Sequence, residues 1–176
     1  SGVKSLTAMT VFMISMVLLY AASTIYHSVN CSGRVLRIFR KMDHMMIFIL
    51  IAGTYTPVCL LTLPKPSGLM LLAAVWGIAL VGIFIKGPKW FSSVLYIAMG
   101  WSCLSVLGQL FSLLPLHAFL WLLAGGLIYT AGGIIYALRL PLFDARHPMF
   151  GLHEIFHLFV MAGSLCHFVF MFCYLA

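Results

Sequence analysis

The stretch GLMLLAAVWGIALVGIFI, residues 68–85, decides the fold class because it is apolar throughout and carries no charge. A helix that crosses a bilayer needs roughly 20 such residues. Breaks rich in Pro and Gly bound the stretch, at Pro64-Lys-Pro-Ser-Gly68 and at Lys86-Gly-Pro-Lys89. We therefore expect residues 68–85 to form a transmembrane helix.

Five more apolar segments extend this pattern over the chain, and their runs are continuous rather than alternating, which favours helices over a barrel. With 64% hydrophobic residues, 7% charged residues and a mean hydropathy of +1.14, the composition excludes a soluble domain. The sequence predicts an all-α, polytopic transmembrane helix bundle in one domain, 1–176. We expect its six spans at about 6–29, 44–63, 68–85, 91–113, 116–138 and 149–175.

The number of basic residues alternates between high and low along the segments that flank and connect the spans. Only Lys4 and Lys65 lie on one side, whereas the loops 31–43, 86–90 and 139–148 carry the other basic residues: Arg34, Arg37, Arg40, Lys41, Lys86, Lys89, Arg139 and Arg146. The positive-inside rule places these three loops in the cytoplasm, with residue 1 and the C-terminus outside. This rule accounts for the net charge of +7, so we expect membrane lipids as partners and no nucleic acid.

Two glycine pairs recur in the fifth span, as Ala124-Gly-Gly-Leu-Ile-Tyr129 and Ala131-Gly-Gly-Ile-Ile-Tyr136. Their seven-residue offset puts Gly125 and Gly132 on one helix face, which predicts close helix packing. The pattern leaves open whether that face packs within the bundle or against another copy of the chain, so the oligomeric state is not predicted.

Polar residues occur at membrane depth in three places: Ser23-Thr-Ile-Tyr-His27, Asp43, and His153-Glu-Ile-Phe-His157. Such residues are costly in a bilayer and indicate a functional site. His153 and His157 are four residues apart, so they share a helix face, as do Ser23 and His27. By the predicted topology, all of them lie near the cytoplasmic ends of their spans.

Three imidazoles and a nearby carboxylate are typical of a zinc site with an open position. We expect His27, His153 and His157 to bind Zn²⁺. Asp43 would hold or deprotonate a water molecule, and Ser23 would orient that water or bind a substrate carbonyl. The alternative is a set of interhelical hydrogen bonds without metal. A lesser alternative is an intramembrane metalloprotease with Glu154 as general base, because His-Glu-x-x-His also occurs in zinc proteases.

The other polar groups have plainer interpretations. We expect the imidazoles of His44, His117, His147 and His167 to be structural or interfacial. The residues Arg34, Arg37 and Lys41 recur at helical spacing among apolar residues, which is compatible with a short interfacial helix on anionic lipid headgroups. Basic charge that only sets the topology explains them equally well.

Four motifs together resemble the hemolysin III family: Ser23-x3-His27, Arg40-Lys-Met-Asp-His44, Ala52-Gly-Thr-Tyr-Thr-Pro57 and His153-Glu-Ile-Phe-His157. This is the bacterial branch of the progestin and adipoQ receptor family, and the resemblance spans almost the whole chain. It implies seven transmembrane helices in a bacterial inner membrane and a zinc site near the cytoplasmic face. The implied zinc ligands are His27, His153 and His157, with Asp43 and Ser23 around the water. Because we count six spans, we expect the family's first helix to be missing from this chain.

The wider superfamily includes alkaline ceramidases, so the resemblance implies a zinc-dependent hydrolase of lipid amides or esters, acting in membrane lipid or fluidity homeostasis. Its ligand would be a lipid amide or a fatty acid. One alternative is a non-enzymatic membrane sensor or receptor with structural zinc, which would use the same ligands. A pore-forming haemolysin ranks lowest, because a multi-span chain makes a poor diffusible toxin.

Overall fold

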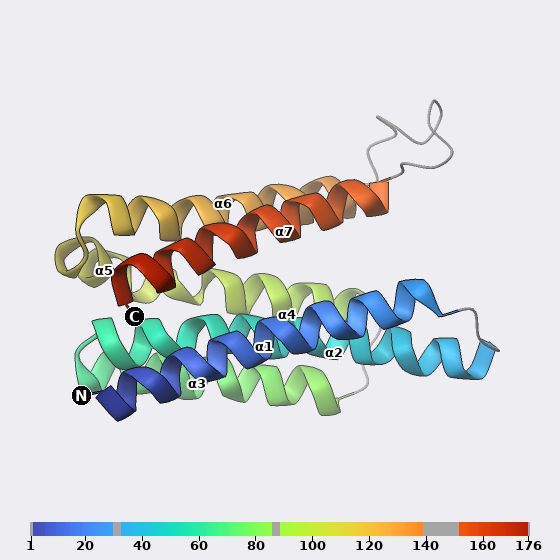
Figure 1. The fold of residues 1–176 in the computed structure, drawn as a ribbon, viewed down its shortest axis with the longest axis horizontal. Coiled ribbons are helices and arrows are strands. Elements are labelled where there is room, and N and C mark those ends of the chain that lie inside the picture. The colour runs from blue at the N-terminus through green and yellow to red at the C-terminus, as the bar shows by residue number, and fades with distance from the viewer. Residues whose placement is uncertain (1, 30–32, 86–88, 139–151, 176) are drawn as a thin grey trace. The chain divides into compact units, whose positions relative to one another are not determined.

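Every element of the protein that the computed structural model describes is a helix (Figure 1). The described residues are 2–29, 33–85, 89–138 and 152–175. Within them, six helical segments are long and apolar enough to cross a membrane. The predicted all-α bundle with six spans is therefore confirmed. The α-helices are α1 (Gly2–Ser28), α2 (Gly33–Pro57), α3 (Lys65–Phe84), α4 (Lys89–Trp101), α5 (Leu107–Leu113), α6 (Leu116–Leu138) and α7 (Leu152–Phe170).

Three short helical segments of other geometry continue these α-helices. The π-helical turn η1 (Val58–Thr62) follows α2, and η3 (Met171–Leu175) follows α7 in the same way. The 3₁₀ segment η2 (Ser102–Val106) joins α4 to α5. The helices group into two compact units, Ser1–Leu113 and Leu114–Leu175, and each unit is described by itself. The assignment of the whole chain to one domain stays a prediction.

Helix α2 is the centre of the first unit, since it contacts α1, α3 and α4 (Figure 1). Half of the residues in the most apolar part of the span that contains α2 are buried, whereas only 17–28% are buried in the corresponding parts of the other five spans. The ring of Phe48 lies against Gly82 of α3 and packs on Tyr96 of α4 at 4.4 Å between ring centroids. A glycine at position 82 leaves room for that ring.

The outer faces of these helices are apolar. Val3, Met70 and Phe84 are each more than 70% exposed, an arrangement that would be unfavourable in water and suits contact with lipid. Several hydroxyl groups inside the described spans donate to backbone carbonyl oxygens of their own helix. Those of Thr54 and Thr56, for example, donate to the carbonyl oxygens of Leu50 and Ala52. These two hydroxyl groups are therefore buried and paired, as a membrane interior requires.

The second helix is longer than the predicted span 44–63, because it begins at Gly33 and continues without a break to Thr62. The charged residues between 34 and 43 mark a limit of apolar sequence, but Arg and Lys are good helix formers and do not end a helix. Conversely, the predicted span 91–113 is one apolar run, yet the structure divides it among α4, η2 and α5.

In the second unit, α6 and α7 lie side by side (Figure 1). A Cβ atom on Gly125 would collide with the His167 ring, and one on Gly132 would lie 2.5 Å from the Cβ of Phe159. By contrast, Gly126 and Gly133 have open space around them. The first glycine of each pair therefore packs against α7, as the seven-residue offset predicts for one face.

Candidate functional site

The first unit brings Ser23 and Asp43 to the same level of an antiparallel helix pair. This level follows from a contact between the two helices about one turn away, where the Nε of Arg40 on α2 donates to the hydroxyl of Tyr26 on α1 at 2.8 Å. Ser23 lies three residues before Tyr26 on α1, and Asp43 lies three residues after Arg40 on α2. Because the two helices run in opposite directions and pack together, equal steps from one contact reach one depth.

A second contact between α1 and α2 supports this register. Gly53 of α2 is so close to the side chain of Ser15 that a Cβ atom at position 53 would overlap it. Ser15 lies eight residues before Ser23, and Gly53 lies ten residues after Asp43. Two contacts therefore set the register of α1 against α2. The Ser15–Gly53 contact lies deeper along the helices than Ser23 and Asp43, and the Tyr26–Arg40 contact lies nearer the helix ends.

The environment of Asp43 is unusual for a carboxylate. Asp43 is only 9% exposed, whereas the surrounding basic residues Arg40 and Lys41 are exposed. On the α4 side, the hydroxyl of Tyr96 donates to the carbonyl oxygen of His44 at 2.8 Å. A buried carboxylate in a membrane helix is costly unless hydrogen bonds, a cation or a metal compensate for lost water.

His27 lies one turn beyond Ser23, near the end of α1, and its imidazole packs edge-on against the Tyr26 ring at 4.7 Å between centroids. His44, expected to be structural or interfacial, is exposed, and its Nδ1 lies 2.8 Å from the carbonyl oxygen of Arg40 on its own helix. Ser23 and Asp43 therefore lie at one level of the α1–α2 pair, with His27 one turn beyond Ser23, while the His44 ring contacts the backbone of its own helix.

The second unit carries the other predicted ligands, His153 and His157, which both lie in the first two turns of α7. The His157 side chain is half-buried, whereas the side chains of His153 and Glu154 lie outside the described ones. Among the side chains that the structure describes, no three His, Cys, Asp or Glu groups form a cluster that could hold a metal ion. The three-histidine zinc set and the protease alternative both stay predictions.

Two supporting residues were not singled out from the sequence. Tyr26 and Arg40 form the hydrogen bond described above, and the guanidinium carbon lies 5.7 Å from the centre of the Tyr26 ring. The available signal was position alone, since Tyr26 precedes His27 and Arg40 lies one turn before Asp43. Sequence spacing shows such neighbours only after the register of α1 against α2 is known.

His167 is the other notable imidazole of the second unit. Its ring meets the Tyr129 ring edge-on at 5.5 Å, and the Tyr129 hydroxyl lies 2.7 Å from the Ser164 Oγ. Both ring nitrogens of His167 are buried and have no hydrogen-bond partner within the described part of the chain. The close fit to Gly125 agrees with the structural role expected for this residue.

Six helical segments of this length and apolarity within the described residues define a multi-pass helical membrane protein. The model of the family described as "Haemolysin-III related" matches residues 2–168. This chain belongs to the haemolysin III family, which confirms the resemblance found in its motifs.

Two relatives from bacilli show the same relationship. The chain is 39% identical over 166 residues to "Hemolysin-3" of Bacillus cereus, a match that covers 92% of this chain and 72% of that protein. It is 36% identical over 164 residues to "Hemolysin-3 homolog" of Bacillus subtilis (strain 168), covering 90% of this chain and 73% of the relative.

Proposed function

We propose that the protein is a zinc-dependent membrane hydrolase that cleaves lipid amides or esters in the bacterial inner membrane. The observation that carries this proposal is buried Asp43, which the register of α1 against α2 brings to the level of Ser23, one turn from His27. A buried carboxylate in a membrane helix is a costly arrangement that packing alone does not require.

The donor chemistry fits zinc. Neutral imidazoles are among its preferred ligands, and His27, His153 and His157 would hold the ion. When bound, zinc supplies a Lewis acid and makes water a stronger nucleophile at neutral pH. Asp43 would hold that water and accept its proton, and the Ser23 hydroxyl would donate a hydrogen bond to the carbonyl of the lipid. The apolar outer face of the helices suits a substrate that arrives from the bilayer.

The test begins with the zinc content of the purified protein by elemental analysis. We expect about one zinc per chain in the wild type and its loss in His27→Ala, His153→Ala and His157→Ala. His117→Ala is the matched control, because it removes an exposed imidazole from α6 that we place outside the site. Asp43→Asn should keep most of the zinc but hydrolyse a ceramide or phospholipid probe at least about 100-fold more slowly, as expected for loss of a general base.

The outcomes separate the competing functions. Absence of metal from the folded wild-type protein would overturn the proposal and leave the histidines as an interhelical hydrogen-bond clamp. Stoichiometric zinc with no release of fatty acid from either amide or ester probes would favour a sensor or receptor with structural zinc. The name of the relatives suggests a third function, lysis of cells. Lysis of erythrocytes by purified protein that does not hydrolyse lipid would favour a pore-forming haemolysin.

A further inference from the structure

The first ten residues of α2 form a basic extension of a transmembrane helix. The continuous helix Gly33–Thr62 has 30 residues and is therefore about 45 Å long, some 15 Å longer than the hydrocarbon core of a bilayer. The excess corresponds to about ten residues. The apolar sequence begins after Asp43, so this excess falls on residues 33–42 and places them at the depth of the lipid headgroups.

The outer surface of this extension has two adjacent stripes. Arg34, Arg37 and Lys41 fall within an arc of about 60°, and all three are exposed. A neighbouring arc carries three exposed apolar side chains: Val35, Ile38 and Met42. Basic and apolar stripes side by side suit a helix at the boundary between lipid phosphates and acyl chains.

The guanidinium of Arg40 is held in place by a residue of the neighbouring helix. The Nε donates to the Tyr26 hydroxyl at 2.8 Å, and the cation lies 5.7 Å from the centre of the Tyr26 ring. This bond uses one of the five N–H donors of a guanidinium and leaves those on the two Nη atoms for a ligand. A fixed, planar pair of donors is the geometry that binds phosphate through two parallel hydrogen bonds.

The charge balance favours an anion here. The chain has 10 Lys and Arg residues against only three acids, and Asp43, the acid nearest to Arg40 in the sequence, is buried. Arg37 lies one turn before Arg40 and adds a second exposed cation. We propose that Arg40, held by Tyr26 and assisted by Arg37, binds the phosphate of an anionic membrane phospholipid.

This site would also select the substrate, a step that rests on the proposed function. Asp43 lies three residues beyond Arg40, which is about 4.5 Å deeper along the helix axis. A lipid whose phosphate is bound by Arg40 would present the bonds that join its acyl chains near the level of Ser23 and Asp43. The substrate class would then be an anionic lipid.

The test measures lipid binding directly, without turnover. Purified protein in neutral detergent is titrated with phosphatidylglycerol or with phosphatidylcholine, and bound lipid is counted by native mass spectrometry. We expect tighter binding of phosphatidylglycerol, and a loss of about tenfold in Arg40→Gln and in Arg40→Lys, because Lys cannot reproduce the paired hydrogen bonds. Tyr26→Phe should lose about threefold, because it releases the guanidinium.

Two matched controls carry the same change of charge. Arg34→Gln alters the exposed stripe of the same helix, and Lys65→Gln alters the start of α3; both should stay within about twofold of the wild type. Equal losses in Arg34→Gln and Arg40→Gln, with no loss in Arg40→Lys, would overturn the proposal in favour of diffuse attraction. Displacement of the lipid by millimolar inorganic phosphate would assign the site to a soluble anion instead.

Zinc content and unfolding temperature are measured on the same samples. Arg40→Gln that keeps its fold and its zinc but loses phosphatidylglycerol supports the headgroup site separately from the metal site. If the wild type binds no zinc yet binds phosphatidylglycerol through Arg40, the proposed hydrolase fails while the headgroup site stands. If zinc and hydrolysis are present and Arg40→Lys binds phosphatidylglycerol normally, the headgroup proposal alone fails.

Discussion

At the scale of single residues, glycines decide how closely the helices of this protein approach. Gly53, in the motif Ala52-Gly-Thr-Tyr-Thr-Pro57, lies directly against the Ser15 side chain of α1. Lipid tails are as apolar as a helix surface, so association of membrane helices depends on such close packing. The contact also helps to set the register that brings Ser23 level with Asp43.

Gly53→Ala should therefore destabilise the protein, by about 1–3 kcal/mol, because the new methyl group overlaps Ser15 and pushes α1 away. Gly77→Ala is the matched control, since nothing lies within 4 Å of a Cβ at that position of α3. Thermal unfolding in detergent measures both variants. A Gly53→Ala protein as stable as Gly77→Ala would contradict the close packing of α1 on α2.

At the scale of elements, the break between α4 and α5 is the feature that sequence periodicity missed. The Tyr55 hydroxyl donates to the carbonyl oxygen of Gly100 at 2.9 Å and accepts the backbone N–H of Cys103 at 3.0 Å. These two groups lie where α4 gives way to the 3₁₀ segment η2. A tyrosine of α2 thus satisfies backbone groups at an irregular turn at membrane depth, where water is absent.

Tyr55→Phe should weaken this turn and lower the stability of the protein by about 1–2 kcal/mol, because two backbone groups lose their partner. Hydrogen exchange should become faster at the amide of Cys103, whereas amides in the middle of α3 should not change. Tyr174→Phe is the control, because that ring is 39% exposed. Unchanged exchange at Cys103 would show that η2 does not depend on the Tyr55 hydroxyl.

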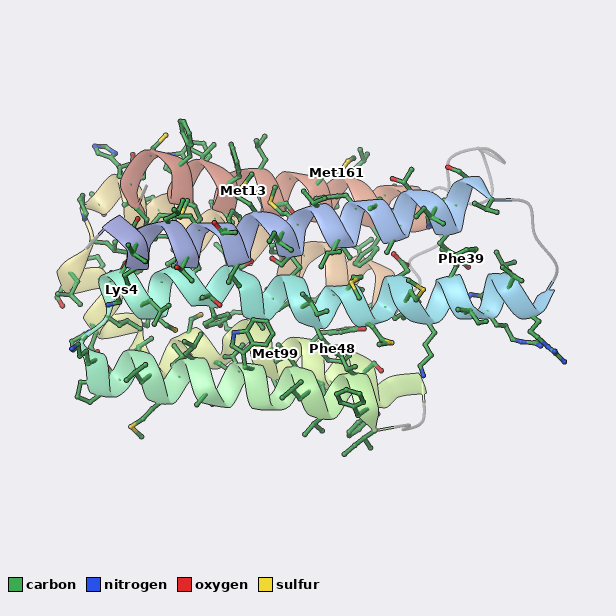
Figure 2. All side chains as sticks on the ribbon, turned by 60° about the horizontal axis from the view of Figure 1, so that its bottom comes forward. Lys4, Met13, Phe39, Phe48, Met99 and Met161 are labelled. Atoms are coloured by element: carbon green, nitrogen blue, oxygen red, sulfur yellow. The ribbon has the colours of Figure 1, made fainter. Side chains whose placement is uncertain are left out.

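At the scale of the whole molecule, the first unit carries more positive charge at one end than at the other. Lys4 and the segment around Phe39 lie at opposite ends of the helices (Figure 2). The end with Phe39 holds Arg34, Arg37, Arg40 and Lys41, whereas Lys4 and Lys65 begin α1 and α3. The positive-inside rule assigns the end with Phe39 to the cytoplasm.

We therefore expect opposite labelling of two cysteines placed in a chain whose five native cysteines are replaced. In intact cells, a membrane-impermeant maleimide should react with Lys65→Cys and should reach Arg37→Cys only after the membrane is opened. Both positions are exposed in the structure, so access to the side chain does not bias the comparison. The reverse pattern would invert the topology and put Asp43 near the outer face.

Much of the candidate site could be predicted from sequence because polar residues in apolar spans are rare and conspicuous. Ser23, His27 and Asp43 were identified in this way, and the helix pair α1–α2 brings Ser23 and Asp43 level. The role of Arg40 could not be predicted. Its interaction with Tyr26 joins residues 14 positions apart on two helices, and it depends on the packing angle and register of those helices.

The sequence by itself determined the class of the fold. A continuous apolar run that crosses a bilayer must pair its backbone groups within itself, and a helix does this. It also determined the family and the residues of the candidate site, through motifs whose polar groups are costly in lipid. Only the tertiary structure decided where α2 begins, where α4 breaks and which side chain holds Arg40. Those features depend on contacts between helices, and local apolarity and periodicity do not encode which faces meet.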